Sequence, residues 1–164
     1  MKPVTQVGLT CYAACIASIL EMPLEDVCRP MKTSEQEFDG WLIERNLYPV
    51  RIPIEEATPW APPGYIMLWG IAADDYVHCV VCFDGEVVWN PDDEDTGKLV
   101  RPLGWIMFCT LDPTLPTGIP VRQDVRSMTE IAVRAKATFD KMLQSGGELR
   151  RQTVWPTKHE TVVQ

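Results

Sequence analysis

The chain has 164 residues, of which 46% are hydrophobic and 23% are charged, and its formal net charge at pH 7 is −8. These values are typical of a globular protein of about one domain, and no apolar run approaches the ~20 residues that span a bilayer. An acidic chain is a poor candidate for gripping nucleic-acid phosphates. No signal-peptide-like apolar segment follows Met1, so we expect a cytoplasmic protein with no membrane partner and no nucleic-acid partner.

The charge is unevenly divided along the chain. Residues 1–120 carry a net charge of −11, whereas residues 121–164 carry a net charge of +3. This asymmetry favours two arrangements, in which the basic C-terminal part either docks on the acidic body or meets an acidic partner.

Six cysteines occur in a chain without an export signal, so we expect free thiols and not a disulfide framework. Most free cysteines are small buried hydrophobes, and this is the default interpretation of all six: Cys11, Cys15, Cys28, Cys79, Cys82 and Cys109.

The N-terminal third is predicted to be helical. Residues 11–21 are Ala-rich and apolar on nearly every side, which predicts a buried helix that Thr10 caps and Pro23 ends. A short helical turn is expected at residues 24–28. Residues 34–46 carry apolar side chains at helical spacing, which predicts a second, amphipathic helix.

The middle of the chain is predicted to form a sheet. Five prolines between residues 49 and 63 exclude a helix there and leave short extended pieces such as residues 50–52. The predicted major strands are residues 65–69, 77–83, 86–90 and 105–111. Because the helices come first and an antiparallel sheet follows them, the expected fold class is α+β.

The C-terminal part is predicted to add one helix to this core. Residues 128–145 form a helix that begins at a capping box, Ser127 to Glu130, and ends at Gly146-Gly147. Its predicted apolar stripe consists of Met128, Ala132, Ala135, Phe139 and Met142. We expect this stripe to pack on its own domain, with exchange into a dimer through the helix as the alternative.

This pattern divides the chain into four parts: a core domain over residues 1–112, a Pro-rich linker over residues 113–120, the appended helix within residues 121–147 and a mobile tail over residues 148–164.

Cys11 and His78 are the candidates for nucleophilic chemistry. Cys11 lies at the start of the first predicted helix, where the helix dipole lowers the pKa of a thiol. His78 begins an apolar strand, whereas the second histidine, His159, lies in the polar tail, and imidazole is the usual base for a thiol nucleophile. By position alone, each could equally be a structural side chain of the core.

The hairpin at Asp84-Gly85 bears on whether Asn90 joins these two residues. A three-residue loop with Gly85 in the left-handed region would place Asn90 opposite His78, where it could fix the imidazole tautomer. A two-residue loop would pair Cys79 with Asn90 and turn Asn90 away from His78. The triad hypothesis therefore predicts the three-residue loop, with Asp92 as the next candidate if it fails.

Two blocks of the sequence resemble papain-like cysteine peptidases, most closely the bacteriocin-processing peptidase domains of ABC exporters and small uncharacterised bacterial and bacteriophage proteins. The first block is residues 6–17, QVGLTCYAACIA, and the second is residues 76–91, from YVHCVVCFDG to VVWNP. The resemblance covers residues 1–111. It implies a papain-like fold, with Cys11 as nucleophile, His78 as base, Asn90 orienting His78 and Gln6 as an oxyanion-hole donor.

The resemblance also implies a function. The expected activity is that of a thiol hydrolase that cleaves a peptide or isopeptide bond of a protein or peptide substrate through a Cys thioester, in the host cytoplasm if a phage encodes it. Acidic residues on both sides of His78 would favour basic substrates. Two alternatives stay open: a deamidase or transglutaminase-like acyl transferase, and a non-catalytic peptidase-fold protein that binds and inhibits a host factor.

Two metal sites are weaker alternatives. His78, Cys79 and Cys82 include a Cys-x-x-Cys spacing, but the strand-forming Val80-Val81 would put the two thiols on opposite faces. Residues 91–97 are rich in oxygen ligands but lack the EF-hand spacing, which favours a solvated acidic loop. We therefore expect no metal and no cofactor.

Overall fold

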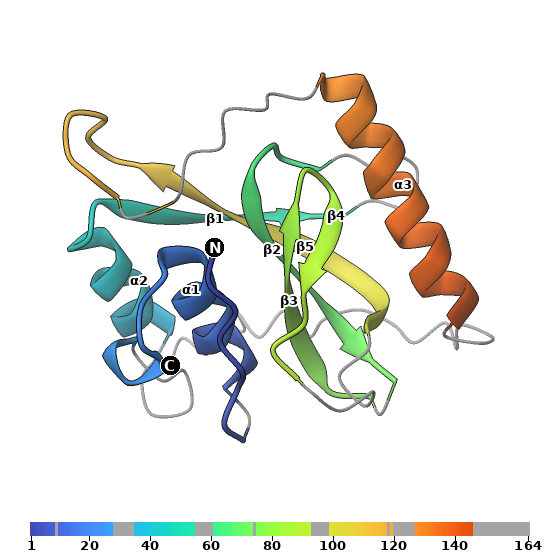
Figure 1. Ribbon diagram of the computed structural model, residues 1–164, viewed down its shortest axis with the longest axis horizontal. Coiled ribbons are helices and arrows are strands. Elements are labelled where there is room, and N and C mark those ends of the chain that lie inside the picture. The colour runs from blue at the N-terminus through green and yellow to red at the C-terminus, as the bar shows by residue number, and fades with distance from the viewer. Residues whose placement is uncertain are drawn as a thin grey trace, which may run out of the picture.

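The computed structural model describes residues 1–8, 10–27, 35–54, 61–73, 75–92, 99–117, 119 and 127–145. Within these residues the chain is α+β, as expected, with three α-helices and a five-stranded antiparallel sheet (Figure 1). The helices are α1 (Cys11–Leu20), α2 (Glu35–Ile43) and α3 (Met128–Ser145), with a 3-10 turn η1 at Leu24–Asp26. The strands are β1 (Leu47–Pro53), β2 (Tyr65–Ala72), β3 (Val77–Phe83), β4 (Glu86–Trp89) and β5 (Leu99–Thr110), in the spatial order β1-β5-β2-β3-β4.

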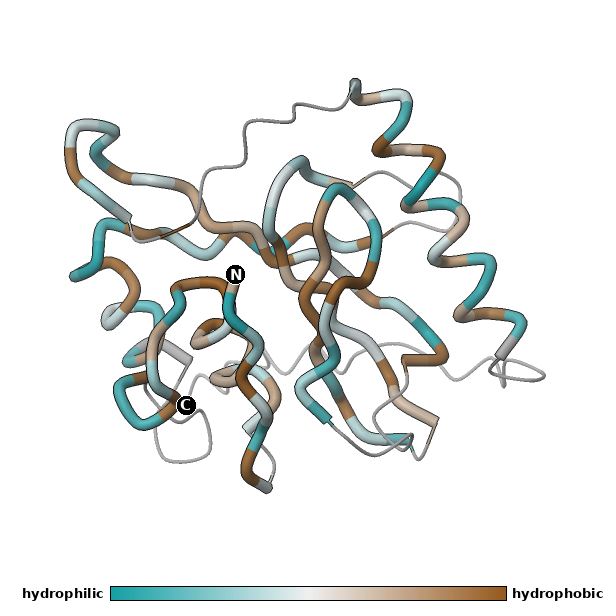
Figure 2. The backbone as a smooth tube through the Cα atoms, viewed as in Figure 1, coloured by the Kyte–Doolittle hydropathy of each residue, from teal (hydrophilic) through white to brown (hydrophobic). Residues whose placement is uncertain are grey.

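The sheet separates two layers of helix. Helices α1 and α2 lie on one side of the sheet and α3 lies on the other (Figure 1). Figure 2 shows long apolar stretches in α1 and the central strands, whereas α3 alternates between apolar and polar residues. Alternate side chains of β2 and β3 enter two different cores: Met67, Cys79 and Val81 on the α1 side, and Leu68, Val80 and Cys82 on the α3 side. This two-sided burial explains why residues 77–83 form a nearly continuous apolar run.

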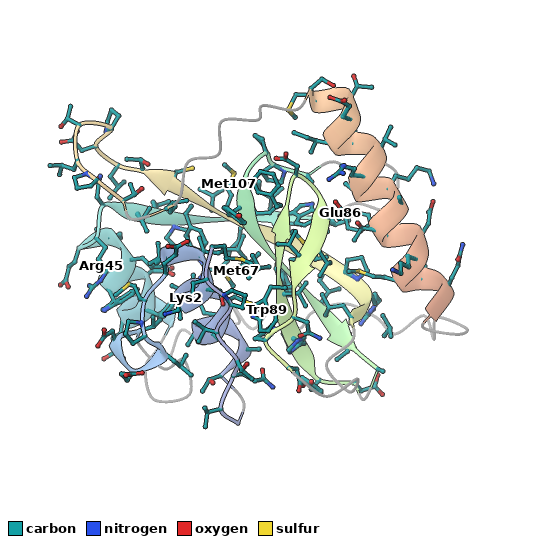
Figure 3. The ribbon with its side chains drawn as sticks, in the orientation of Figure 1. Lys2, Arg45, Met67, Glu86, Trp89 and Met107 are labelled. Carbon is teal, nitrogen blue, oxygen red and sulfur yellow. The ribbon has the colours of Figure 1, made fainter. Side chains whose placement is uncertain are left out.

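Helix α1 is held close to the sheet by its small residues. Every residue from Ala13 to Leu20 is buried, and Figure 3 shows Met67 between α1 and the sheet. Thr10 occupies the N-cap position but its hydroxyl does not cap the helix, which corrects the expected role of this side chain. The hydroxyl instead accepts a bond from the backbone N–H of Val7 and donates to the Val7 carbonyl, each at 3.0 Å.

Strands β1 and β5 are longer than the sequence predicts, and both contain prolines, which are uncommon inside strands. Strand β1 contains Pro49 and Pro53 and lies at the edge of the sheet, where a missing N–H is tolerated. Strand β5 begins at Leu99 and not at Trp105. Its Pro102 lies opposite Gly70, beside an irregularity in the β2–β5 register.

Helix α3 packs on its own sheet, as expected. Ser127 and Glu130 form the capping box, with the Ser127 N–H donating to the Glu130 carboxylate (2.8 Å) and the Glu130 N–H to the Ser127 hydroxyl (3.3 Å). Phe139 stacks on Trp105 with ring centroids 5.5 Å apart. The apolar stripe begins at Ile131, which is 1% exposed, and not at Met128, which is 48% exposed. Figure 3 shows Glu86 beside α3, where it forms an ion pair with Arg134.

The predicted linker begins as a turn tied to the core. The Asn46 side chain donates to the Asp112 carbonyl and accepts from the Asp112 N–H, each at 2.7 Å. Most of residues 118–126, the stop at Gly146-Gly147 and the tail over residues 148–164 lie outside the described residues. The division into a core domain and appended parts stays a prediction. In the described part of the chain, no helix has the length and apolar character required to cross a membrane.

Candidate active site

Cys11 is the first residue of α1, and it is half-exposed. Since the Thr10 hydroxyl turns back to Val7, no side chain caps this end of the helix. The first N–H groups of the helix are therefore not occupied by a cap, and they carry the positive end of the helix dipole. This setting favours a thiolate at Cys11 and can accommodate negative charge next to it.

The His78 imidazole is fully buried and is hydrogen-bonded to Asn90. The distance from Nε2 of His78 to Oδ1 of Asn90 is 2.8 Å. The same Oδ1 accepts the backbone N–H of Asp92 at 3.1 Å, which identifies it as the amide oxygen. An amide oxygen only accepts, so Nε2 of His78 carries a proton. In the neutral ring, Nδ1 is then the basic nitrogen.

The other ring nitrogen of His78 is Nδ1. It is buried and has no hydrogen-bond partner of standard geometry among the described residues. Cys11 nevertheless interacts with the imidazole closely enough to raise its pKa, and Nδ1 is the only nitrogen left for the thiol. Catalytic hydrogen bonds are often poorly aligned in a free enzyme and improve when substrate binds.

A bulge in the β3–β4 hairpin brings Asn90 to His78. The ladder pairs Phe83 with Glu86, Cys82 with Val87 and Val81 with Trp89. The loop is therefore the two residues Asp84-Gly85, with φ of 49° and 80°, and the prediction of a three-residue loop is wrong. However, Val88 is the extra residue of a β-bulge and is not paired with a residue of β3. The side chains after it therefore point to the opposite faces from those of a regular ladder. Asn90 consequently lies on the same side as His78 despite the two-residue loop.

Gly85 serves both the turn and the packing of α3. Its positive φ of 80° is costly for other residues, and a Cβ there would lie 2.9 Å from the backbone nitrogen of Ala135. The turn is also held by the loop before β2, because the Asp84 carboxylate accepts a hydrogen bond from the Gly64 N–H at 2.8 Å. The hairpin that carries Asn90 is thus held between the loop before β2 and α3.

The thiol and the imidazole shift each other's titration. The pKa of Cys11 is lowered from 9.0 to about 5, chiefly by a hydrogen bond from the Cys79 side chain and further by His78, while burial opposes the change. Burial disfavours the charged form of His78, but the interaction with the Cys11 side chain, the hydrogen bond to Asn90 and the negative charges of Cys11 and Asp92 outweigh it. The pKa of His78 is therefore raised above 6.5. Both shifts favour a thiolate–imidazolium pair near neutral pH.

Cys79 is a member of the site that the sequence did not reveal. Its side chain is 4% exposed and belongs to the buried cluster against which Cys11 packs, and its pKa is raised by the interaction with Cys11 and by burial. The Cys15 thiol donates to the Cys79 carbonyl at 3.4 Å, which ties the first turns of α1 to β3. The position of Cys79 next to His78 was the available signal for a role in the site, but the sequence alone favoured a small buried hydrophobic side chain.

Tyr76 and Asp92 form a wall beside the imidazole. The Tyr76 ring meets the His78 ring edge-on at 5.6 Å, and its hydroxyl donates to the Asp92 carboxylate at 3.0 Å. Asp92 is thereby held where its charge favours the imidazolium. Of the other acidic residues expected around His78, Asp75 is exposed, while Asp74 and residues 93–97 lie outside the described residues.

Gln6 lies next to the loop that follows Asn90. Its backbone N–H donates to the Pro91 carbonyl at 2.9 Å, and Trp89 donates from its indole to the Val4 carbonyl at 3.2 Å. Figure 3 shows Trp89 between the N-terminal segment and the hairpin. Oε1 of Gln6 is buried without a hydrogen-bond partner. The structure thus brings Gln6 to the Asn90 side of the site, and its role as a donor stays a prediction.

A cavity of about 410 Å³ lies on the α3 side of the sheet, between the β3–β4 hairpin and α3. Asn90 is among its lining residues, whereas Cys11 and His78 are not. Since the thiol does not open into this space, we do not assign it as the substrate site.

The described cysteines are all free thiols, and burial of Cys15, Cys79 and Cys82 matches the default interpretation. Cys28 and the greater part of the acidic loop lie outside the described residues. Among the described side chains, no group of three or more His, Cys, Asp and Glu residues could hold a metal ion. Comparisons with protein-family models, with curated proteins and with solved structures found no match to this chain.

Proposed function

We propose that the protein is a papain-like thiol hydrolase that cleaves a peptide or isopeptide bond through a Cys11 thioester. The observation that carries the proposal is the 2.8 Å bond between Nε2 of His78 and Oδ1 of Asn90. This bond leaves Nδ1 as the basic nitrogen, beside a thiol whose pKa is lowered to about 5 at a helix N-terminus. The three side chains have the relationship that a nucleophile, a base and a residue orienting the base require.

The chemistry follows from the charges of the pair. The Cys11 thiolate attacks the carbonyl carbon, and the C–N bond breaks as the His78 imidazolium gives its Nδ1 proton to the leaving amine. Neutral His78 then takes a proton from water, whose oxygen attacks the thioester; the C–S bond breaks, and the acid and the Cys11 thiolate are released beside the His78 imidazolium. Asn90 keeps the imidazole in the same orientation in both halves of the reaction.

The negative charge that develops on the carbonyl oxygen during each attack must be stabilised by hydrogen-bond donors. The uncapped N-terminus of α1 supplies the backbone N–H of Cys11. Gln6, which lies beside Pro91, is the second proposed donor. Its buried amide has an unpartnered Oε1, and its Nε2 would have to point toward the oxyanion.

The proposed substrates are proteins or peptides with basic residues near the cleaved bond. Asp92, beside His78, and the exposed Asp75 place negative charge at one end of the site. Such a field attracts a cationic chain and repels an acidic one. Deamidation and transamidation share the thioester step, so the acceptor found in product analysis separates them from hydrolysis.

The proposal is tested by the reactivity of the thiols toward iodoacetamide at pH 7. Cys11 should be alkylated far faster than Cys109, the other half-exposed cysteine among the described residues. The Cys11→Ser variant, which keeps the shape but not the thiolate, is the control. Peptide mass spectrometry assigns each adduct to its cysteine.

A peptide library derived from a proteome then tests turnover. New amine ends, or ammonia in the case of deamidation, should appear with the wild type and not with Cys11→Ser. Equally slow alkylation of Cys11 and Cys109, together with no turnover, would contradict the proposal and support the binding protein instead.

A further inference from the structure

The Asn90 amide lies just beyond the end of the β3–β4 ladder. The last pair of that ladder is Val81–Trp89, and both His78 and Asn90 lie beyond it. The two residues meet through the 2.8 Å side-chain bond from Nε2 of His78 to Oδ1 of Asn90. The amide at the end of an asparagine side chain can turn by half a rotation and present its NH₂ group in place of its oxygen. The direction of this amide therefore depends on its other contacts.

Two further residues, Asp92 and Tyr76, connect the Asn90 amide back to the His78 ring. The backbone N–H of Asp92 donates to the same Oδ1 at 3.1 Å, a bond that only the oxygen end of the amide can accept. The Asp92 carboxylate accepts the Tyr76 hydroxyl at 3.0 Å. The Tyr76 ring meets the His78 ring edge-on, with centroids 5.6 Å apart. Together with the bond between His78 and Asn90, these contacts close a ring of four residues.

Both sides of this ring are anchored to the rest of the fold. Tyr76 directly precedes β3, and its carbonyl accepts the Ala72 N–H at 2.8 Å across the turn between β2 and β3. On the other side, the Pro91 carbonyl accepts the Gln6 N–H at 2.9 Å. The bond from Tyr76 to Asp92 joins these two anchored segments where the hairpin ladder has ended. The Tyr76 hydroxyl thus connects the loop after β4 to the start of β3.

We propose that Tyr76 and Asp92 are positioning residues for the His78 imidazole. By fixing the direction of the Asn90 amide, they select which ring nitrogen is basic. With the amide oxygen toward Nε2, the neutral ring carries its proton on Nε2 and Nδ1 is the base. With the amide reversed, its NH₂ group would donate to Nε2, the ring proton would lie on Nδ1, and Cys11 would lose its base. The selection itself needs no substrate, whereas its effect on turnover rests on the proposed function.

The tautomer of His78 is measured by ¹⁵N NMR of the full chain labelled at histidine. The measurement uses the Cys11→Ser background, which removes the charge of the thiolate, and a pH above the titration of the His78 ring. Nε2 should then appear as the protonated nitrogen and Nδ1 as the unprotonated one. The second histidine of the chain, His159, is identified by the loss of its signals in His159→Gln.

Tyr76→Phe removes the hydroxyl and keeps the aromatic ring beside His78. Because the bond to Asp92 is lost, this variant should show a mixture of tautomers, in which the signals of the two ring nitrogens move toward each other. Adding Asn90→Asp should restore the single tautomer, because a carboxylate presents an oxygen in either direction. Tyr48→Phe is the matched control. It removes the hydroxyl of an exposed tyrosine on β1 and should leave the tautomer unchanged.

Variants of Asp92 separate the hydrogen bond from the charge. Asp92→Asn keeps an oxygen that accepts the Tyr76 hydroxyl, so it should keep the single tautomer although the negative charge is gone. Asp92→Ala should give the same mixture as Tyr76→Phe, and combining the two should add nothing, because both remove one bond. In chains that retain Cys11, Tyr76→Phe should lower kcat roughly tenfold with little change in KM, and Asn90→Asp should restore most of the loss.

An unchanged single tautomer in Tyr76→Phe would overturn the inference, and so would a mixture that Asn90→Asp does not restore. If Tyr76→Phe does not fold, Asp92→Ala breaks the same bond from the other side and decides the question. If the tautomers change as expected but no chain with Cys11 turns over a peptide, the proposed function fails and this inference stands. If turnover is found while the tautomer does not respond to the loss of the hydroxyl, this inference fails and the proposed function stands.

Discussion

Asn90 and His78 are joined by a 2.8 Å side-chain hydrogen bond although the hairpin between them has a two-residue loop. In a regular ladder such a loop would direct the two side chains to opposite faces. The extra residue Val88 compensates for it. A β-bulge of one residue therefore determines whether the base of the proposed triad has an orienting partner.

The pH dependence of Cys11 reactivity is the first prediction. Since the pKa of the Cys11 thiol is lowered to about 5, the alkylation rate should rise with a midpoint near pH 5 and level off well below the usual thiol value of 9.0. Since the pKa of His78 is raised above 6.5, the imidazolium persists to a higher pH than in a free histidine side chain. Turnover should therefore be bell-shaped, with the acid limb set by Cys11 and the alkaline limb by His78. A single midpoint near 9.0 would contradict the thiolate–imidazolium pair.

The second prediction concerns the donor from Cys79. The Cys79→Ala variant should move the midpoint of Cys11 alkylation upward, because this hydrogen bond is the largest cause of the lowered pKa. Cys79→Ser should shift it less, since a hydroxyl can still donate. Cys82→Ala, which changes a buried thiol on the other side of the sheet, should leave it unchanged. Alkylation rates measured across pH for the four proteins separate these expectations.

Replacing Asn90 tests the orientation of the base. Asn90→Ala should reduce turnover by less than His78→Ala, which removes the base itself and should cost roughly 10²–10⁴-fold. Asn90→Asp should preserve more activity, because a carboxylate oxygen still accepts from Nε2 of His78 and from the Asp92 N–H. Rates with a cleaved peptide provide the measurement. Equal losses in Asn90→Ala and Asn90→Asp would show that the acceptor is not what matters.

The bulge can be tested by changing the length of β4. Deleting Val88 should leave the site assembled, because Val81 then faces Trp89 in a regular ladder and Asn90 keeps its side. Inserting one alanine between Trp89 and Asn90 should turn Asn90 away and reproduce the effect of Asn90→Ala. The ¹⁵N chemical shifts of the His78 ring report the tautomer in each protein. Loss of the His78 tautomer on deletion of Val88 would refute this account of the hairpin.

The packing of α3 gives a prediction about stability. Phe139→Ala should lower the free energy of unfolding by about 3 kcal/mol, because it removes a buried ring that stacks on Trp105. Val133→Ala, on the exposed side of the same helix, should change it by less than about 0.5 kcal/mol. Urea denaturation of both variants measures the difference. Similar stabilities would mean that α3 is not part of the cooperative fold.

Much of the fold is predictable because it depends on local patterns. The Ala-rich run gives α1, the apolar run gives β3, and the Ser127–Glu130 capping box forms as the sequence predicts. Strand β5 extends beyond the predicted residues 105–111 to begin at Leu99, and its Pro102, a residue that is uncommon inside a strand, lies opposite Gly70 beside an irregularity in the register. The sequence predicts Met128 in the buried stripe of α3, but it is the first residue of the helix and is exposed.

The candidate site, too, was predictable from the sequence in part only. By itself, the sequence determined the residue types and their positions on elements: a thiol at a helix start, a histidine in a buried strand, and an asparagine after the next strand. Only the tertiary structure decided that Asn90 faces His78, since a one-residue bulge reverses a strand's faces without leaving a distinct signal in the sequence. Only the packing of α1 on β3 brought Cys79 to Cys11, because that contact joins residues 68 positions apart and depends on how closely two elements approach.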